Sequence, residues 1–215
     1  LYEDLHRHPE LHDQEQWTGA RMADELGKAG FKVIDGLGGH GRVGVLENGA
    51  GPVLMIRTIM DALPIAENTG LPFASKATAK ADDGTAVPVS HVCGHDAIMT
   101  AGLGAARYLA AHRDAWRGTL VVVTQPADES ILGARKMIKD GFVNAVPKPD
   151  FILAYHVLPD YRSDQVAWVK GDVLAGSETA EIVVRGVPGH ASFPSDAKDP
   201  VPLAAETVLA LQTFM

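Results

Sequence analysis

The sequence contains a single cysteine, Cys93, among its 215 residues. One cysteine cannot form a disulfide within the chain, which excludes a small secreted fold held together by disulfides. A reducing cytoplasm is the default location for a chain of this composition. We therefore expect a cytoplasmic protein.

Long hydrophobic runs and clusters of basic residues are also missing. No apolar stretch approaches the roughly 20 residues that a membrane-spanning helix needs, so we expect a soluble protein without a membrane partner. Lysine and arginine together number 19 against 27 aspartates and glutamates, and the formal net charge is −8. Without a basic patch the chain lacks the electrostatic footprint of a nucleic-acid-binding protein, and we exclude nucleic acid as its partner.

The residues that are abundant indicate an enzyme-like core. Hydrophobic residues make up 46% of the chain, and there are 22 glycines. This composition is typical of an α/β enzyme, and the length allows one large domain or two small ones. The chain begins at Leu1 and ends inside a helix predicted over 200–214, which has no cap or stop signal. We interpret the chain as a fragment of a longer protein.

Hydrophobic patterning predicts helices that alternate with strands. Helices are predicted over 14–29, which Gly30 closes, and over 96–113 and 130–140. Strands are predicted over four runs, 41–47, 52–58, 119–125 and 151–157. The last three runs are almost wholly apolar, as in strands that are buried on both faces. The alternation predicts a layered α/β fold with a mostly parallel sheet, and 66–90 is predicted to be a long surface excursion.

The character of the sequence changes after residue 160. The runs 165–171 and 179–187 alternate between apolar and polar residues, which predicts two amphipathic strands before the last helix. We place a domain boundary near 170–176. The chain then consists of a first domain, 1–172, and the beginning of a second domain, 173–215.

Acidic and imidazole side chains follow three of the apolar strands. Asp61 follows the second predicted strand, Asp128 and Glu129 follow the third, and His156 lies near the end of the fourth. The carboxyl ends of strands gather at one edge of an open α/β sheet, where binding sites form. Cys93 and His95 precede the helix predicted from residue 96 and are candidates for the same edge.

This residue set favours a metal site, and other interpretations stay open. A Cys-x-His pair on extended backbone points both side chains to one side, and thiolate, imidazole and carboxylate are typical zinc ligands. Alternatively, Cys93 is a small buried apolar residue and His156 a core histidine. In that interpretation Asp128 and Glu129 cap a helix, and Asp61 lies in a turn.

A thiol nucleophile is the main chemical rival. Cys93 would need a histidine to activate its sulfur. His95 is too close in sequence for the usual arrangement, although His156 could serve. The neighbouring acids Asp128 and Glu129 fit metal-assisted hydrolysis better, with one acid binding metal and the other transferring protons.

Seven motifs, in order along the chain, carry a resemblance to a known family. They are LHRHPELHDQE, RTIMDALPIAENTGLPFASK, HVCGHD, QPADE, GARKMIKDGF, YHVLP and GVPGHASFPSDAKDPV. The chain resembles, over essentially its whole length, the amidohydrolase branch of the aminoacylase/carboxypeptidase G metallopeptidases, which includes hippurate hydrolases and auxin-conjugate hydrolases. The resemblance implies a catalytic α/β domain interrupted by a smaller α+β dimerisation domain, and a homodimer formed through that insert. It also implies that the catalytic domain resumes after the insert and supplies a last metal-binding histidine.

The resemblance also implies a division of roles among the candidate residues. One or two divalent ions, zinc or manganese with cobalt or nickel as alternatives, are bound by Cys93, His95, Glu129 and His156. Asp128 stands at the general-base position, Asp61 matches the acid that orients a metal ligand, and His190 matches an insert-domain histidine that reaches the substrate across the dimer. The implied substrates are N-acyl amino acids or similar small amide conjugates, cleaved by metal-activated water.

Three positions depart from the family pattern. Ile59 replaces an aspartate, Ile98 stands where a second histidine is usual, and Asp128 replaces a glutamate and is one methylene shorter. A displacement of about 1 Å of a catalytic base is enough to slow a reaction severely. These departures motivate a second hypothesis, a catalytically impaired relative that binds a ligand or dimerises. A cysteine hydrolase is the third.

Overall fold

The computed structural model describes residues 1–173, 176 and 180–213. The chain divides into two compact units, Leu1–Arg162 and Ser163–Met215. This division precedes the boundary expected near 170–176, and the side chains between the two positions are open to solvent. Val166 is 95% exposed and Trp168 is 84% exposed. The identity of the units as catalytic and dimerisation domains stays a prediction.

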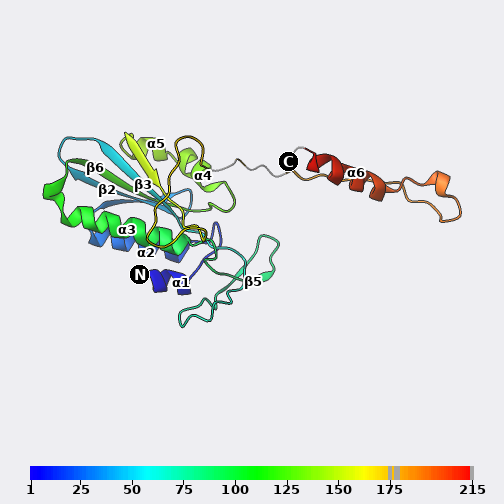
Figure 1. Cartoon of the computed structure of the whole chain (residues 1–215), viewed down its shortest axis with the longest axis horizontal. Helices are drawn as coiled ribbons and strands as arrows, with labels where there is room; N and C mark the ends of the chain where they lie inside the picture. Colours follow the sequence, from blue (N-terminus) through cyan, green and yellow to red (C-terminus); the bar gives the residue numbers. More distant parts are fainter. Residues whose placement is uncertain (174–175, 177–179, 214–215) are drawn as a thin grey trace. The chain divides into compact units, whose positions relative to one another are not determined.

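A five-stranded sheet forms the centre of the first unit (Figure 1). Its strands, in order across the sheet, are β1 (Lys32–Leu37), β2 (Gly41–Asn48), β6 (Gly118–Gln125), β3 (Val53–Ile59) and β7 (Phe151–Ala154). Strand β3 is parallel to β6 and β7, whereas β2 is antiparallel to β1 and β6. The predicted layered α/β fold is confirmed, but the sheet is mixed rather than mostly parallel, because β1 and β2 add antiparallel pairs to the parallel pairs of β6, β3 and β7. Strand β1 is an addition that hydrophobic patterning did not predict.

Helices cover both faces of the sheet. Helices α2 (Gln16–Lys28) and α3 (His95–Ala111) pack on one face together with α1 (Tyr2–Arg7), and α4 (Gly133–Lys139) packs on the other, where α5 (Phe142–Ala145) follows it. The alternation of side chains along β6 explains the two layers, since successive residues of a strand point to opposite faces. Leu120 and Val122 belong to the core beneath α2 and α3, while Val121 and Val123 belong to the core beneath α4.

The remaining elements of the first unit are short. A 3-10 helix covers Arg113–Ala115, and the predicted surface excursion 66–90 contains a two-stranded hairpin, β4 (Thr78–Lys80) and β5 (Ala86–Pro88). Most side chains of this excursion are at least partly exposed.

Helix α3 approaches β3 closely at Gly102. A Cβ atom at this buried glycine would overlap Cγ2 of Thr58, which lies on β3. We predict that Gly102→Ala destabilises the protein, because the gain in helix propensity is outweighed by overpacking of about 1–3 kcal/mol. Gly104, exposed on the same helix, has no atom within 4 Å of its Cβ position, and Gly104→Ala should stabilise by about 0.5–1 kcal/mol. Urea unfolding of the two variants measures the contrast, and equal effects would contradict it.

Strand β7 does not match the expectation of a strand buried on both faces. Phe151, Ile152 and Leu153 are 62%, 60% and 57% exposed. The strand lies at the edge of the sheet and pairs only with β3 among the described strands. It also ends at Ala154, so His156 lies in the segment that follows the strand.

In the second unit the final helix is confirmed and the two strands are wrong. Helix α6 spans Pro200–Gln212, and the Asp199 carboxylate caps it by accepting a hydrogen bond from the Val201 amide at 2.9 Å. A 3-10 helix covers Pro194–Asp196. The described parts of 165–171 and 179–187 contain no strand, only an isolated bridge at Val187, because their apolar side chains lie exposed without a partner strand. Residue 214 of the predicted helix lies outside the described residues.

Among the described helices, none combines the length and the apolar character that a membrane crossing requires.

Candidate metal centre

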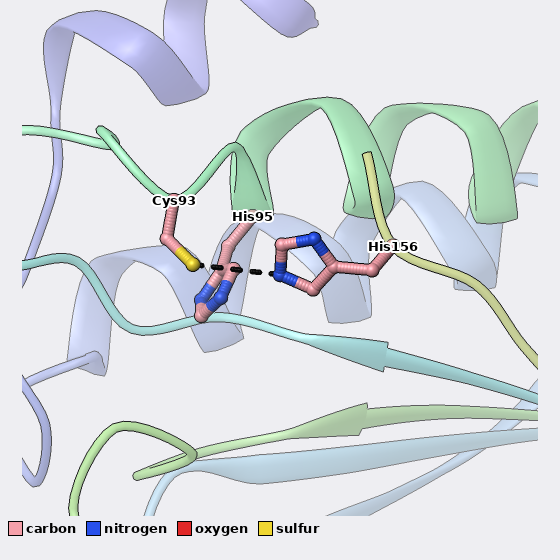
Figure 2. A group of neighbouring side chains, drawn as sticks. All are labelled: Cys93, His95 and His156. Carbon is pink, nitrogen blue, oxygen red and sulfur yellow. Dashed lines mark hydrogen bonds between the residues drawn. The ribbon is translucent and has the colours of Figure 1, made fainter. Parts of the chain in front are cut away.

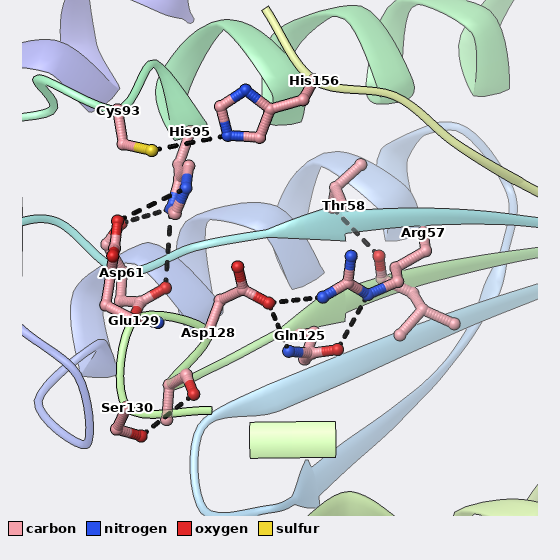
Figure 3. A network of polar contacts seen from close by, with 12 residues as sticks. Arg57, Thr58, Asp61, Cys93, His95, Gln125, Asp128, Glu129, Ser130 and His156 are labelled. Atoms are coloured by element: carbon pink, nitrogen blue, oxygen red, sulfur yellow. Dashed lines mark hydrogen bonds and ion pairs between the residues drawn. The ribbon is translucent and has the colours of Figure 1, made fainter. Parts of the chain in front are cut away.

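The predicted site residues of the first unit come together at one edge of the sheet (Figure 3). Asp61 follows β3, Asp128 and Glu129 follow β6, and His156 follows β7, while His95 begins α3. These three strands are parallel, so their carboxyl ends lie at the same edge. The crossover through α3 brings the Cys93–His95 segment to this edge as well.

Cys93, His95 and His156 form a compact group whose potential ligand atoms all lie within 4.8 Å of one another (Figure 2). Sγ of Cys93 lies 3.4 Å from Nε2 of His156, and the two imidazole rings meet edge to face with centroids 5.7 Å apart. His95 is buried, Cys93 is half-buried and His156 is exposed. The cluster is therefore open to solvent on one side.

Backbone carbonyls orient both imidazole rings. Nδ1 of His95 donates to the Asp61 carbonyl at 2.7 Å, and Nδ1 of His156 donates to the Val157 carbonyl at 2.7 Å. A neutral histidine that donates from Nδ1 keeps the lone pair of Nε2 for another partner. Both rings are therefore held in the tautomer that binds a metal through Nε2.

Glu129 supplies the observation that tests whether a cation fits. Its Oε1 lies 3.7 Å from Nε2 of His95, is buried, and has no hydrogen-bond partner among the described residues. An unpaired buried carboxylate oxygen is costly. Because Nδ1 of His95 donates to the Asp61 carbonyl, Oε1 of Glu129 faces either the N–H of a charged His95 ring or the lone pair of Nε2 in a neutral ring. In the neutral case a cation between Glu129 and His95 would bind both atoms, so the donor set fits a divalent metal ion.

Asp61 supports both sides of this arrangement. Its Oδ2 accepts a hydrogen bond from the Glu129 amide at 2.8 Å, and its Oδ1 lies 3.5 Å from Nδ1 of His95. Burial tends to raise the pKa of Asp61, but the contacts with His95 and with the amides of Glu129 and Asp128 lower it overall. Burial opposes the charged form of His95, yet the contacts with Asp61 and the charge of Glu129 raise its pKa. The site is thus electrostatically negative and favours a bound cation.

One carboxylate oxygen of Asp128 is paired with a neighbouring cation, Arg57 (Figure 3). Its Oδ1 lies 2.5 Å from a guanidinium nitrogen of Arg57 and accepts a hydrogen bond from Gln125 at 3.0 Å. Gln125 in turn accepts a hydrogen bond from Nε of Arg57 at 2.8 Å. Sequence reasoning missed Arg57 and Gln125. The available signal was the period of two along β3, which places Arg57 on the same side of the strand as Ile59, the residue that departs from the family pattern.

Similarity to known proteins places the chain in a family. A model of peptidase family M20/M25/M40 matches residues 55–212. The chain belongs to this family. A hippurate hydrolase of Campylobacter jejuni is 37% identical over 213 residues, 98% of this chain and 52% of that protein. An N-acetylcysteine deacetylase of Bacillus subtilis is 35% identical over 221 residues, 99% of this chain and 53% of that protein.

A solved structure supports the fold assignment within the M20/M25/M40 family. The YXEP protein of Bacillus subtilis, described as a dinuclear metal-binding peptidase, superposes with a TM-score of 0.63 at 35% identity. The superposition covers 74% of this chain and 42% of that one. The chain spans about half the length of the curated relatives it matches. The resemblance inferred from the seven motifs is thereby confirmed at the level of the family.

The family departures Ile59 and Ile98 are both buried, 4% and 1% exposed. Ile98 lies three residues after His95 on α3 and thus on the same side of the helix. His190 belongs to the second unit, where its Nδ1 accepts a hydrogen bond from the Ser192 amide at 3.2 Å. Its role in this M20 chain stays a prediction.

The environment of Cys93 predicts a poorly reactive thiol in the metal-free protein. Burial and the neighbouring charges of Glu129, Asp128 and Asp61 raise the pKa of Cys93 to about 11. Since only the thiolate is alkylated, the rate with iodoacetamide should rise about tenfold per pH unit until the pH approaches 11. N-acetylcysteine in the same buffers is the control. A rate that levels off near pH 8 would contradict this prediction and would favour a thiol nucleophile.

Proposed function

We propose that this chain is the metal-holding part of an amidohydrolase that cleaves the amide bond of N-acyl amino acids or similar small conjugates. The observation that carries the proposal is the convergence of Cys93, His95 and His156, with the unpartnered oxygen of Glu129 beside them. Membership of the M20/M25/M40 family and the names of its relatives, a hippurate hydrolase and an N-acetylcysteine deacetylase, support the reaction class.

The cluster residues would hold one or two divalent ions. Zinc or manganese fits a mixed sulfur, nitrogen and oxygen set, and cobalt or nickel is the alternative. The chemistry supplied by an ion held there is Lewis acidity, which makes water a better nucleophile at neutral pH and polarises the scissile carbonyl. Asp61 would fix the His95 ring through its carbonyl and the Glu129 backbone through its carboxylate.

Asp128 would move the proton. We assign it as the base that accepts a proton from the attacking water and returns it to the leaving amine. Because Arg57 and Gln125 both bind Oδ1 of Asp128, Oδ2 is the oxygen assigned to this transfer.

The second unit would belong to an inserted α+β domain through which two copies of the protein dimerise. In that arrangement His190 would reach the substrate bound by the partner and stabilise its developing oxyanion. A cytoplasmic location, where Cys93 stays reduced, is part of the same proposal.

The proposal is tested on the full-length protein by metal analysis together with hydrolysis assays on N-acetyl and N-benzoyl amino acids. We expect one or two bound ions per chain and turnover that a chelator abolishes and added Zn²⁺, Mn²⁺ or Co²⁺ restores. Turnover that resists the chelator but is lost on alkylation of Cys93 would replace this function by that of a cysteine hydrolase.

A catalytically impaired relative is the second candidate, and two observations favour it. Oδ1 of Asp128 is engaged by Arg57, and the buried residues Ile59 and Ile98 are aliphatic where the family resemblance implies polar side chains. Stoichiometric tightly bound metal without turnover of any acyl amino acid, with turnover restored by Asp128→Glu, would establish this alternative.

A further inference from the structure

The segment 6–15 contributes no residue to the proposed metal centre, yet it contacts three of the four chain segments that form it. The His6 ring bonds to Asp96, the Glu10 carbonyl accepts from the Ala62 amide, and Glu15 accepts from the Ala127 amide. The contacted residues directly adjoin His95, Asp61 and Asp128 in sequence. A small shift of the backbone at these adjoining residues would move the functional side chains directly.

Glu15 contacts the turn that carries Asp128 and Glu129. It is fully buried at the start of α2, and its Oε1 accepts a hydrogen bond from the Ala127 amide at 2.6 Å. Its Oε2 is buried without a hydrogen-bond partner among the described residues. Burial raises the pKa of Glu15 to about 7, and the charges of Asp61 and Asp13 add to this effect. A buried carboxyl with one unpaired oxygen costs stability, so a positioning role would explain its presence.

The turn held by Glu15 is strained. Ala127 has a φ of 51°, and Ile131 has a φ of 61°, both in the left-handed region that side chains other than glycine disfavour. Such residues persist where the surroundings hold them in place. Oγ of Ser130 and the amide of Gly133 both donate to the Ala127 carbonyl, at 3.1 and 3.0 Å. Glu15 holds the Ala127 amide, which belongs to the preceding peptide plane, so both peptide groups that flank the Ala127 Cα are held.

His6 holds the beginning of α3. Its Nδ1 lies 2.6 Å from Oδ2 of Asp96, and its Nε2 lies 3.0 Å from Oε1 of Glu67. Carboxylates only accept hydrogen bonds, so a ring between two of them donates from both nitrogens and is positively charged. Burial opposes that charge, but the bonds to Glu67 and Asp96 raise the pKa of His6 overall. Phe73 and Tyr2 pack against the ring and shield it.

We infer that Glu15 and His6 are positioning residues for the proposed metal centre, with Glu15 setting the turn before Glu129 and His6 setting the first turn of α3 after His95. The expected loss of metal affinity rests on the proposed function, whereas the expected change in backbone hydrogen exchange does not require a metal. Loss of a residue that orients a metal ligand typically lowers metal affinity by about 10–100-fold.

The experiment compares Glu15→Leu, Glu15→Gln and His6→Gln with the unchanged full chain. Co²⁺ is titrated into the metal-free proteins and followed by the thiolate-to-cobalt absorption, and amide hydrogen exchange is measured without metal. Glu15→Leu should weaken Co²⁺ binding about tenfold or more, change the absorption, and speed exchange at the Ala127 and Glu129 amides. Glu15→Gln retains a carbonyl acceptor for the Ala127 amide and should stay within about threefold of the unchanged chain, whereas His6→Gln should weaken binding about tenfold.

Glu25→Leu is the matched control. Glu25 is also a buried glutamate of α2, 4% exposed, but its partners are Arg21 and Arg107, away from the site loops. This variant should lose stability without a change in Co²⁺ affinity or in the exchange of the Ala127 and Glu129 amides.

Four outcomes decide the inference. A folded Glu15→Leu protein with unchanged Co²⁺ affinity and unchanged exchange would overturn the inference, as would equal weakening in Glu25→Leu. If Glu15→Leu does not fold, His6→Gln decides, and unchanged affinity in that variant overturns the inference. If the unchanged chain takes up no Co²⁺, the proposed function fails, and the exchange of the Ala127 and Glu129 amides alone decides whether Glu15 positions the turn.

Discussion

His95→Ala is expected to weaken Zn²⁺ or Co²⁺ binding by about a hundredfold. A four-ligand structural zinc site is worth about 10–16 kcal/mol, so one ligand accounts for roughly 3 kcal/mol, or about two decades of affinity. His95 is the most buried member of the cluster and the one whose ring is fixed by Asp61. Its loss also leaves Oε1 of Glu129 without the imidazole that faces it. Competition titration against a coloured chelator measures the change.

His112→Ala is the control for this result. His112 caps the other end of α3, is exposed, and stacks on Tyr108 outside the cluster. Its replacement should leave metal affinity within about threefold, well inside the effect expected for a lost ligand. If His95→Ala binds metal as tightly as the unchanged protein, the site lies elsewhere and the assignment of Cys93, His95 and His156 is wrong.

Apolar runs predicted where strands would form but not how deeply each is buried. The runs at 52–58 and 119–125 became the central strands β3 and β6, with side chains in both core layers. The run at 151–157 is likewise almost wholly apolar, yet β7 is exposed at the edge of the sheet. An apolar run reports that a strand can be buried, while its neighbours in the sheet decide whether it is. The prediction of strands in the amphipathic runs after residue 160 failed for a related reason, since no partner strand lies beside them in the part of the chain that the structure describes.

The candidate site was predictable because strand ends of a parallel arrangement meet at one edge. That rule brought Asp61, Glu129 and His156 together from separate parts of the chain. It could not predict which way Asp128 turns, because that depends on the backbone of one turn. Ala127 adopts a left-handed φ there, and no residue type in QPADE announces it. Nor does strand-end position reveal contacts such as that of Glu15 with Ala127, which join residues far apart in the sequence.

Asp128→Asn is expected to lower kcat of the full-length protein by about 10²–10⁴-fold while leaving metal affinity unchanged. The amide has nearly the shape of the carboxylate and can still accept hydrogen bonds from Arg57 and Gln125, but it cannot accept the proton of the attacking water. Because Asp128 is not among the cluster residues, metal titration should not distinguish the variant from the unchanged protein. Steady-state assays on the best N-acyl amino acid measure the loss.

Asp128→Glu completes this test, since it introduces the glutamate that the family resemblance implies for a general base at this position. The added methylene lengthens the reach of the carboxylate by about 1 Å, which is enough to change the alignment of a catalytic base. If Asp128 works as the base from its position beside Arg57, Asp128→Asn is nearly inactive and Asp128→Glu is at least as active as the unchanged protein. If the unchanged protein and Asp128→Asn are equally slow while Asp128→Glu is fast, Asp128 is the substitution that silenced the site. Equal activity of all three would instead remove Asp128 from the mechanism, because a base contributing 10²-fold or so cannot be dispensable.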